Sequence, residues 1–261
     1  MTVITLTTDF GAGSPYVAAM KGVILSINSR TTVVDITHGV RPQDVRQAAL
    51  VLDDVAGRFP PESIHVAVVD PGVGTDRAIL YAEIDRQRFV APDNGVLSRV
   101  ARRITPSKII RVSEPEYWLE PVSATFHGRD IMAPVAARLS AGLDPEKLGP
   151  PLEKLVMLGW PEPVVSPGKI EGEVLDVDSF GNLITNVEAP MLAEIPDVGR
   201  ASVELAKCKT EGIRTTYADA PPGALIALVG SSGRLELAIV GGSAAKTLGG
   251  AVGDSVTVCW E

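Results

Sequence analysis

The hydrophobic pattern changes along the chain: short β-rich runs alternate with helical patterns in the first half, and strands alone follow in the second. Alternation of strands and helices is typical of a largely parallel sheet with helices on both faces. The apolar run IHVAVVD predicts a strand that is buried on both faces. The strands expected in this half are residues 3–7, 32–37, 64–70, 78–84 and 108–112.

Three helices are expected beside these strands, each with a recognisable first residue. Ser14 provides an N-cap and Pro15 an N1 residue for the first helix, and apolar residues follow at helical spacing. Asp44 caps the second helix. We expect the third to open at Asp130 and to end at Gly142.

The second half begins after a proline-rich stretch and has almost no helical period. We predict an α/β N-terminal domain over 1–158, a linker over 159–167 and a smaller all-β, barrel-like C-terminal domain over 168–261. The strands expected in the C-terminal domain lie within residues 169–178, 182–188, 201–205, 224–230, 234–241 and 254–260.

Composition limits the partners that the protein can have. A net charge of −8 argues against nucleic acid and anionic membranes, because phosphate binding needs a basic face. No apolar run approaches the ~20 residues of a membrane span, and the N-terminus lacks signal-peptide features, so we expect a cytoplasmic protein. Cys208 and Cys259 have no metal-binding spacing, and we expect both to be small buried hydrophobes.

Four aspartates lie at or near the ends of expected N-terminal strands: Asp9, Asp35, Asp70 and Asp93. Aspartate also favours turns, because its side chain forms hydrogen bonds with its own backbone. That structural role would be enough to explain one such aspartate. Ligands bind outside the carboxyl ends of strands in such sheets. Several aspartates at one edge therefore predict a shared polar site.

Metal and phosphate sites find little support in this sequence. Clustered aspartates can hold Mg²⁺, but the three histidines show no metal-ligand spacing, and His38 and His65 are expected to be structural. The short GAG and GVG segments lack the lysine of a phosphate loop and the full dinucleotide fingerprint.

Two further motifs suggest a reactive centre. In VVDPGVGTDR, Asp70 ends a strand and Arg77 follows a glycine-rich turn; in TFHGRD, His127 precedes a helix start. A histidine there could equally be a cap. Next to Asp70 and Arg77, however, it would form a charged trio able to orient and polarise a small nucleophile.

Seven motifs occur in one order across nearly the whole chain: TTDFG, DITHGV, VVDPGVGTDR, APDNG, TFHGRD, DSFGN followed by TN, and GSSGRLELA. This order resembles that of the S-adenosyl-L-methionine (SAM) hydrolases, or hydroxide adenosyltransferases, which are relatives of the fluorinases and chlorinases. The resemblance implies a two-domain enzyme without cofactor. It implies that water cleaves SAM at the ribose 5′ carbon to give adenosine and methionine.

The resemblance assigns the catalytic trio to Asp70, Arg77 and His127. The halogenases have aromatic residues in place of Asp70 and His127, and an apolar pocket strips a halide of water, so the charged groups here favour hydrolysis. We expect Arg77 to stay protonated and to orient water or hydroxide. Either Asp70 or His127 receives the proton.

The resemblance also implies substrate contacts in both halves of the chain. Asp9 matches the residue that binds both ribose hydroxyls, Asp178 one that faces the methionine ammonium, and Asp70 also borders the substrate. Phe180 stacks on the purine and Asn182 reads its edge. The other positions that match ligand contacts are Ser231, Glu236 and the backbone near Ile239.

The family's assembly and the alternatives to hydrolysis are further expectations. The family forms homotrimers whose sites combine the N-terminal domain of one subunit with the C-terminal domain of the next. A halide-using adenosyltransferase is the first alternative. A non-catalytic sensor of adenosine or SAM is the second, and a metal-dependent phosphoesterase is the last.

Overall fold

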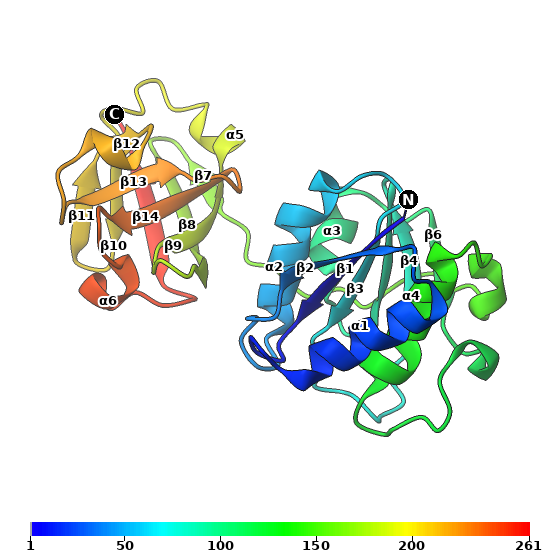
Figure 1. Cartoon of the computed structure of the whole chain (residues 1–261). Coiled ribbons are helices and arrows are strands. Elements are labelled where there is room, and N and C mark those ends of the chain that lie inside the picture. The colour runs from blue at the N-terminus through cyan, green and yellow to red at the C-terminus, as the bar shows by residue number, and fades with distance from the viewer. Residues whose placement is uncertain (1) are drawn as a thin grey trace. The chain divides into compact units, whose positions relative to one another are not determined.

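The computed structural model describes residues 2–261 and divides the chain into two compact units, one ending at Leu158 and the other running from Gly159 to Glu261 (Figure 1). Each unit has its own sheet and its own hydrophobic core. Within residues 2–261 no helix is both long enough and apolar enough to cross a bilayer.

The N-terminal unit is built on one six-stranded sheet of order β2-β1-β3-β5-β4-β6. The pairs β1–β2, β1–β3 and β3–β5 are parallel, whereas β4 is antiparallel to both β5 and β6, which confirms the expected, mostly parallel sheet. Strand β5 was not expected from the sequence. The strands are β1 (Val3–Thr8), β2 (Thr32–Thr37), β3 (Ile64–Val68), β4 (Ile79–Ile84), β5 (Gln87–Pro92) and β6 (Lys108–Arg111).

The helices of this unit begin largely where capping chemistry predicts. Ser14 accepts a hydrogen bond from the Tyr16 N–H, and Asp44 accepts one from the Gln47 N–H, so both N-caps are confirmed. Asp130 does not open a helix, because it lies inside a π-helical turn, Gly128–Met132, that runs into α4. The helices are α1 (Pro15–Ile27), α2 (Val45–Val55), α3 (Ser98–Arg103) and α4 (Ala133–Ser140), with short 3₁₀ turns at Ala56–Arg58, Pro115–Tyr117 and Pro145–Leu148.

Two hydrophobic clusters cover the two faces of the sheet, and β3 contributes to both. Ile64, Val66 and Val68 belong to the cluster that contains residues of α1 and α4. Ala67 and Val69 belong to the cluster that contains residues of α2. Alternate residues of a strand point to opposite faces, so the continuous apolar run here marks a strand buried on both sides, as predicted.

The C-terminal unit is a nearly closed, barrel-like sheet of order β11-β10-β15-β8-β9-β14-β13-β12, with β7 paired to β8. Strand β11 is at one end of this order, and β13 is next to the other end. Thr210 in β11 donates its hydroxyl to the Leu225 carbonyl in β13 at 2.9 Å, so the two ends of the sheet nearly meet. The all-β prediction is confirmed. The strands are β7 (Val164–Ser166), β8 (Lys169–Val177), β9 (Leu183–Glu188), β10 (Ser202–Leu205), β11 (Cys208–Glu211), β12 (Ile213–Arg214), β13 (Leu225–Val229), β14 (Arg234–Ile239) and β15 (Ser255–Cys259), with the short helices α5 (Ala189–Leu192) and α6 (Ala244–Leu248).

Two details of this unit differ from expectation. The stretch 159–167, expected to be a linker, contains β7, which is antiparallel to β8 and therefore forms part of the C-terminal unit. Cys208 and Cys259 are free thiols, but both are only partly buried. Cys208 lies in β11, at one end of the sheet order, and Cys259 is the last residue of β15, on the face opposite to the buried Val256 and Val258.

Candidate active site

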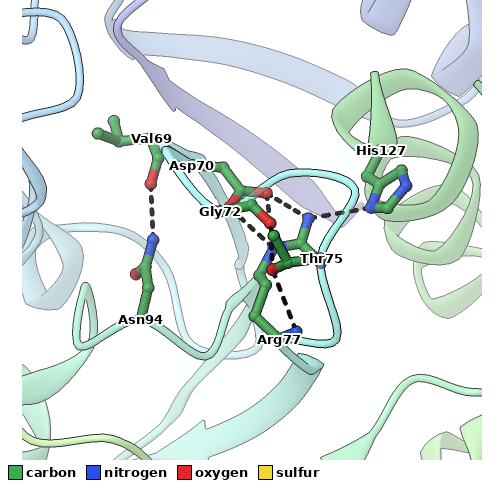
Figure 2. A network of polar contacts seen from close by, with 7 residues as sticks. All are labelled: Val69, Asp70, Gly72, Thr75, Arg77, Asn94 and His127. Carbon is green, nitrogen blue, oxygen red and sulfur yellow. Dashed lines mark hydrogen bonds and ion pairs between the residues drawn. The ribbon is translucent and has the colours of Figure 1, made fainter. Parts of the chain in front are cut away.

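Asp70 and Arg77 form a two-pronged ion pair just beyond the carboxyl end of β3 (Figure 2). Arg77 Nε donates to Asp70 Oδ1 at 2.8 Å, and Arg77 Nη2 donates to Asp70 Oδ2. Only 5% of the Asp70 side chain and 10% of the Arg77 side chain are exposed. Such paired bonds fix a carboxylate in orientation as well as in position.

The turn between these residues explains why the sequence needs its glycines there. Thr75 donates its hydroxyl to the Gly72 carbonyl at 2.7 Å and accepts the Arg77 N–H at 3.4 Å, which closes the turn. Gly74 has φ +81°, and a Cβ on it would lie 2.6 Å from the Ala124 carbonyl oxygen. Glycine is required both for that conformation and for that approach.

His127 completes the cluster from the segment that precedes α4. Arg77 Nη2 donates to His127 Nδ1 at 3.0 Å. Arginine does not deprotonate in proteins, so Nδ1 must accept, and the neutral ring carries its hydrogen on Nε2. Burial lowers the pKa of His127, and the charge of Arg77 lowers it further, against the opposing carboxylates of Asp70 and Asp130.

The segment after His127 packs tightly against the sheet. A Cβ on Gly128 would lie 2.9 Å from Val68 Cγ1, so glycine lets this backbone rest directly on β3. Buried Asp130 accepts the Ser123 N–H at 2.9 Å and pairs with Arg129, which ties the preceding loop to the same turn.

A cavity of about 230 Å³ lies in front of this cluster. Its wall includes Asp9, Asp70 and His127, whereas Arg77 lies outside the wall and holds the other two members of the trio. Asp9 Oδ2 accepts the Gln43 N–H at 2.7 Å, and Gln43 has φ +65°. A left-handed non-glycine residue costs of order 1–3 kcal/mol and tends to cluster at functional sites. The remaining lining residues are Phe10, Gln43, Val68, Pro71, Val73, Thr125, Phe126 and Gly128.

Of the four aspartates expected at or near strand ends, Asp9 and Asp70 line this cavity, whereas Asp35 and Asp93 do not. Asp93 Oδ1 accepts the Val156 N–H at 2.7 Å, so this carboxylate fixes the segment around Val156. Burial raises the pKa of Asp93. Asp35 lies within β2 rather than at its end. Burial by itself would raise the pKa of Asp35, but bonds with Lys21 and His38 outweigh it and lower that pKa.

His65 is structural, as expected. It is fully buried within β3, Nδ1 lies 2.7 Å from Thr5 Oγ1, and Nε2 lies 3.3 Å from Gln87 Oε1. Burial lowers the pKa of His65 to about 4. Over residues 2–261, the structure brings together no group of three metal-ligating side chains.

A second cavity, of about 480 Å³, lies in the C-terminal unit. Phe180, Asn182 and Ile239 line it, and 77% of the Phe180 residue is exposed. Asp178 holds the turn beneath it: Asp178 Oδ1 accepts the N–H groups of Phe180 and Asn182, and Oδ2 accepts Asn182 Nδ2 at 3.0 Å. A Cβ on Gly181, at φ +85°, would lie 2.0 Å from Ser243 Oγ, which explains the glycine in DSFGN.

Sequence reasoning missed Tyr217 in this cavity. Its hydroxyl donates to Glu236, which is 5% exposed, and accepts Asn182 Nδ2 at 3.4 Å. Burial and Glu236 raise the pKa of Tyr217 to about 12, and burial raises the pKa of Glu236. Tyr217 is the one aromatic residue between β11 and β13, and an aromatic side chain in that segment of mostly small and polar residues was the sequence signal for a residue of the cavity wall.

The other contacts expected in the C-terminal unit, Asp178, Ser231 and Glu236, lie outside the wall of its cavity. Glu236 lies behind Tyr217, and Asp178 uses both oxygens on its own turn. Ser231 is exposed in the turn between β13 and β14 and lies outside the wall.

The molecule thus combines an α/β unit that has an Asp–Arg–His cluster at its sheet edge with a β-barrel-like unit that has an aromatic cavity. The chain belongs to the SAM hydroxide adenosyltransferase family, whose N-terminal domain model matches residues 4–149 and whose C-terminal domain model matches residues 172–257.

Individual relatives agree with this family. The chain is 38% identical to an (R)-S-adenosyl-L-methionine hydrolase of Salinispora arenicola, over 98% of this chain and 97% of that protein. A fluorinase of Nocardia brasiliensis is more distant, at 28% identity over 90% of this chain and 89% of its own. A crystal structure of an uncharacterized conserved protein from Thermotoga maritima has a TM-score of 0.93 and 37% identity, with full coverage of both chains.

Proposed function

We propose that this protein is an S-adenosyl-L-methionine hydrolase that forms adenosine and L-methionine. Its full-length identity to a hydrolase exceeds its identity to a fluorinase. The observation that carries the proposal is the cavity wall shared by Asp9, Asp70 and His127, with Arg77 fixing the last two.

The chemistry needs little beyond orientation and one proton acceptor. The oxygen of water bonds to the ribose 5′ carbon, and the carbon–sulfur bond breaks with its electrons moving to sulfur. The sulfonium leaves as the neutral thioether of methionine, so no acid has to protonate it. In-line placement of the water and removal of its proton are the remaining demands.

The hydrogen-bond pattern divides these tasks within the trio. His127 Nδ1 is occupied by Arg77, so the ring donates from Nε2 and orients the water oxygen. Asp70 receives the proton, because a carboxylate has about four acceptor positions and the contacts with Arg77 leave one free. Arg77 acts by holding both partners in place.

Substrate recognition uses both units. Asp9 binds the two ribose hydroxyls, a task suited to a carboxylate with two oxygens. Phe180 stacks on the purine, Asn182 and the backbone near Ile239 read its edge, and Tyr217 forms another part of the wall. Of the remaining assigned contacts, Asp178 faces the methionine ammonium, Ser231 contacts the substrate, and Glu236 supports Tyr217.

A homotrimer with inter-subunit sites accounts for two half-sites in separate units, in a cytoplasmic enzyme. A mixing experiment tests it: Asp70→Asn subunits, mixed and reassembled with Asn182→Ala subunits, should regain a fraction of activity because some sites combine two intact halves. Light scattering gives the mass in parallel. A trimer without recovered activity would place each site within one subunit.

Hydrolysis is tested with SAM in ¹⁸O-labelled water, where the 5′ hydroxyl of adenosine should carry the label. Separate (R) and (S) sulfonium epimers show which one is consumed. Saturating chloride addresses the halogenase alternative, for which 5′-chloro-5′-deoxyadenosine is the diagnostic product. Tight adenosine binding without any turnover would instead indicate a sensor.

A further inference from the structure

The DITHGV segment, residues 35–40, has no part in the proposed chemistry, yet it contacts the loop that presents Asp9. His38 Nδ1 lies 3.0 Å from Thr8 Oγ1. The same oxygen accepts the Phe10 N–H at 3.3 Å. One hydroxyl therefore joins His38 to the residues on both sides of Asp9.

The main chain of this segment holds the same loop. The Gly11 N–H donates to the His38 carbonyl at 2.8 Å, and the Val40 N–H donates to the Thr8 carbonyl at 3.4 Å. Asp9 thus lies on a short loop whose two ends are both bonded to residues 38–40.

An irregularity in the sheet brings His38 to this place. Leu6 pairs with Asp35, but the next residue, Thr7, pairs with Thr37, so β2 contains one extra residue at this point. Bulges of this kind re-aim side chains and are over-represented beside active sites. Without the extra residue, His38 would be displaced one position along the strand.

The Asp35 carboxylate lies beside the imidazole on its other side. His38 Nε2 lies 3.1 Å from Asp35 Oδ1, and Lys21 Nζ donates to Asp35 Oδ2 at 2.6 Å. A carboxylate beside Nε2 favours the tautomer that carries its hydrogen there, so Nδ1 accepts the Thr8 hydroxyl. Thr8 is fully buried, and its oxygen then donates to His38 and accepts from Phe10.

We propose that His38, oriented by Asp35, is a positioning residue that holds Thr8 and thereby fixes the Asp9 carboxylate for the ribose hydroxyls. The inference rests on the proposed function, because it assigns those hydroxyls to Asp9. It predicts an effect on ribose selectivity rather than a general loss of binding.

The first test compares Thr8→Val, which removes the hydroxyl at nearly constant shape, with Thr8→Ser, which retains it. The Kd values of adenosine and 2′-deoxyadenosine are measured on the full chain. Thr8→Val should raise the adenosine Kd about five- to tenfold and the 2′-deoxyadenosine Kd less than about twofold, because a mispositioned charged acceptor loses hydroxyl bonds. Thr8→Ser should keep most of the ribose preference.

The chain offers a matched control on the same strand. Thr5 Oγ1 lies 2.7 Å from His65 Nδ1, and both residues are fully buried away from the Asp9 loop. Thr5→Val removes the same kind of contact and should lower the melting temperature without changing the ratio of the two Kd values. The inference would be overturned if Thr8→Val raised the Kd values of adenosine and 2′-deoxyadenosine by the same factor, or if it changed neither Kd.

Two histidine variants decide the matter if Thr8→Val does not fold. The amide oxygen of asparagine lies near the place of Nδ1, so His38→Asn should retain more of the ribose preference than His38→Gln. Equal Kd ratios in both variants and in the wild type contradict the inference.

Asp9→Asn separates this inference from the proposed function. If Asp9→Asn abolishes the ribose preference while the Thr8 and His38 variants retain it, the positioning role fails and the proposed function stands. If Asp9→Asn itself retains the preference, the ribose role of Asp9 fails, and the inference fails with it.

Discussion

The two cavities of this protein use polar groups in opposite ways. In the N-terminal unit, Asp70 and His127 form part of the wall and are held from behind by Arg77. In the C-terminal unit, Phe180 and Tyr217 form the wall, and Glu236 lies behind it. The first cavity presents carboxylates and an imidazole beside its phenyl rings, whereas the second presents aromatic rings and an amide but no charged side chain. We infer that chemistry belongs to the first and recognition of the base to the second.

The largest expected effect separates these roles in the N-terminal unit. Asp70→Asn keeps the shape of the side chain but removes the proton acceptor, so kcat should fall about 10²- to 10⁴-fold while KM changes less than about threefold. Steady-state kinetics with SAM measures both constants. Asp93→Asn is the matched control, since Asp93 also ends a strand but lies outside the cavity, and it should retain kcat.

The second effect belongs to the C-terminal cavity. Phe180→Ala should raise KM about 10- to 100-fold with kcat nearly unchanged, because stacking on a base contributes roughly 1–3 kcal/mol. Val252→Ala, an exposed apolar residue of the same unit, is the control. A fall in kcat as large as that of Asp70→Asn would abolish the proposed division between the cavities.

A pH profile sharpens the comparison, because only the N-terminal cavity has a histidine in its wall. The pKa of His127 is lowered, so the neutral ring persists below the usual 6.5, and log kcat should begin to fall only at more acidic pH. Protonation of Nδ1 at acidic pH would make the His127 ring cationic, and it would then repel Arg77 instead of accepting its hydrogen bond. His127→Asn, which keeps an acceptor near Nδ1, should be slower by roughly tenfold and lack this acid limb.

Stability must be followed in the same pH series. The folded-state pKa values of His127 and His65 lie below that of the unfolded chain, so both residues contribute stability above pH 6.5 that is lost as the pH falls. For His65 the loss should extend down to about pH 4. A melting curve at each pH separates unfolding from the loss of turnover.

The smallest effect concerns the support behind the aromatic wall. Tyr217→Phe keeps the ring but leaves buried Glu236 without that donor, so the free energy of unfolding should drop by about 1–3 kcal/mol. The ring remains, so KM should rise only about twofold to fivefold, less than in Phe180→Ala. Glu236→Gln, which carries no charge to leave buried, should restore much of the stability in the double variant. A KM increase beyond that of Phe180→Ala would mean that the hydroxyl itself reads the base.

The fold was largely predictable because its signals are local. The α/β unit was predicted from two local signals. Apolar residues at a period of 3.6, with Ser14 and Asp44 as caps, indicated the helices, and the β-rich runs between them indicated the strands. Strand β5 was missed because Gln87–Pro92 alternates weakly and is recognisable mainly as the partner that lies between β3 and β4. The helix start predicted at Asp130 was wrong, because Asp130 lies inside the π-helical turn Gly128–Met132 and its carboxylate accepts the Ser123 N–H instead of capping a helix.

By itself, the sequence determined the change from alternating to all-β architecture, the strand-tip aspartates and the order of the motifs, because each depends on neighbouring residues. Only the tertiary structure decided which of these residues meet. Strand order places Asp9 and Asp70 at one cavity, and a π-helical turn brings His127 to Arg77 across 50 residues of chain. Long-range contacts of this kind depend on register and packing, which no local pattern specifies.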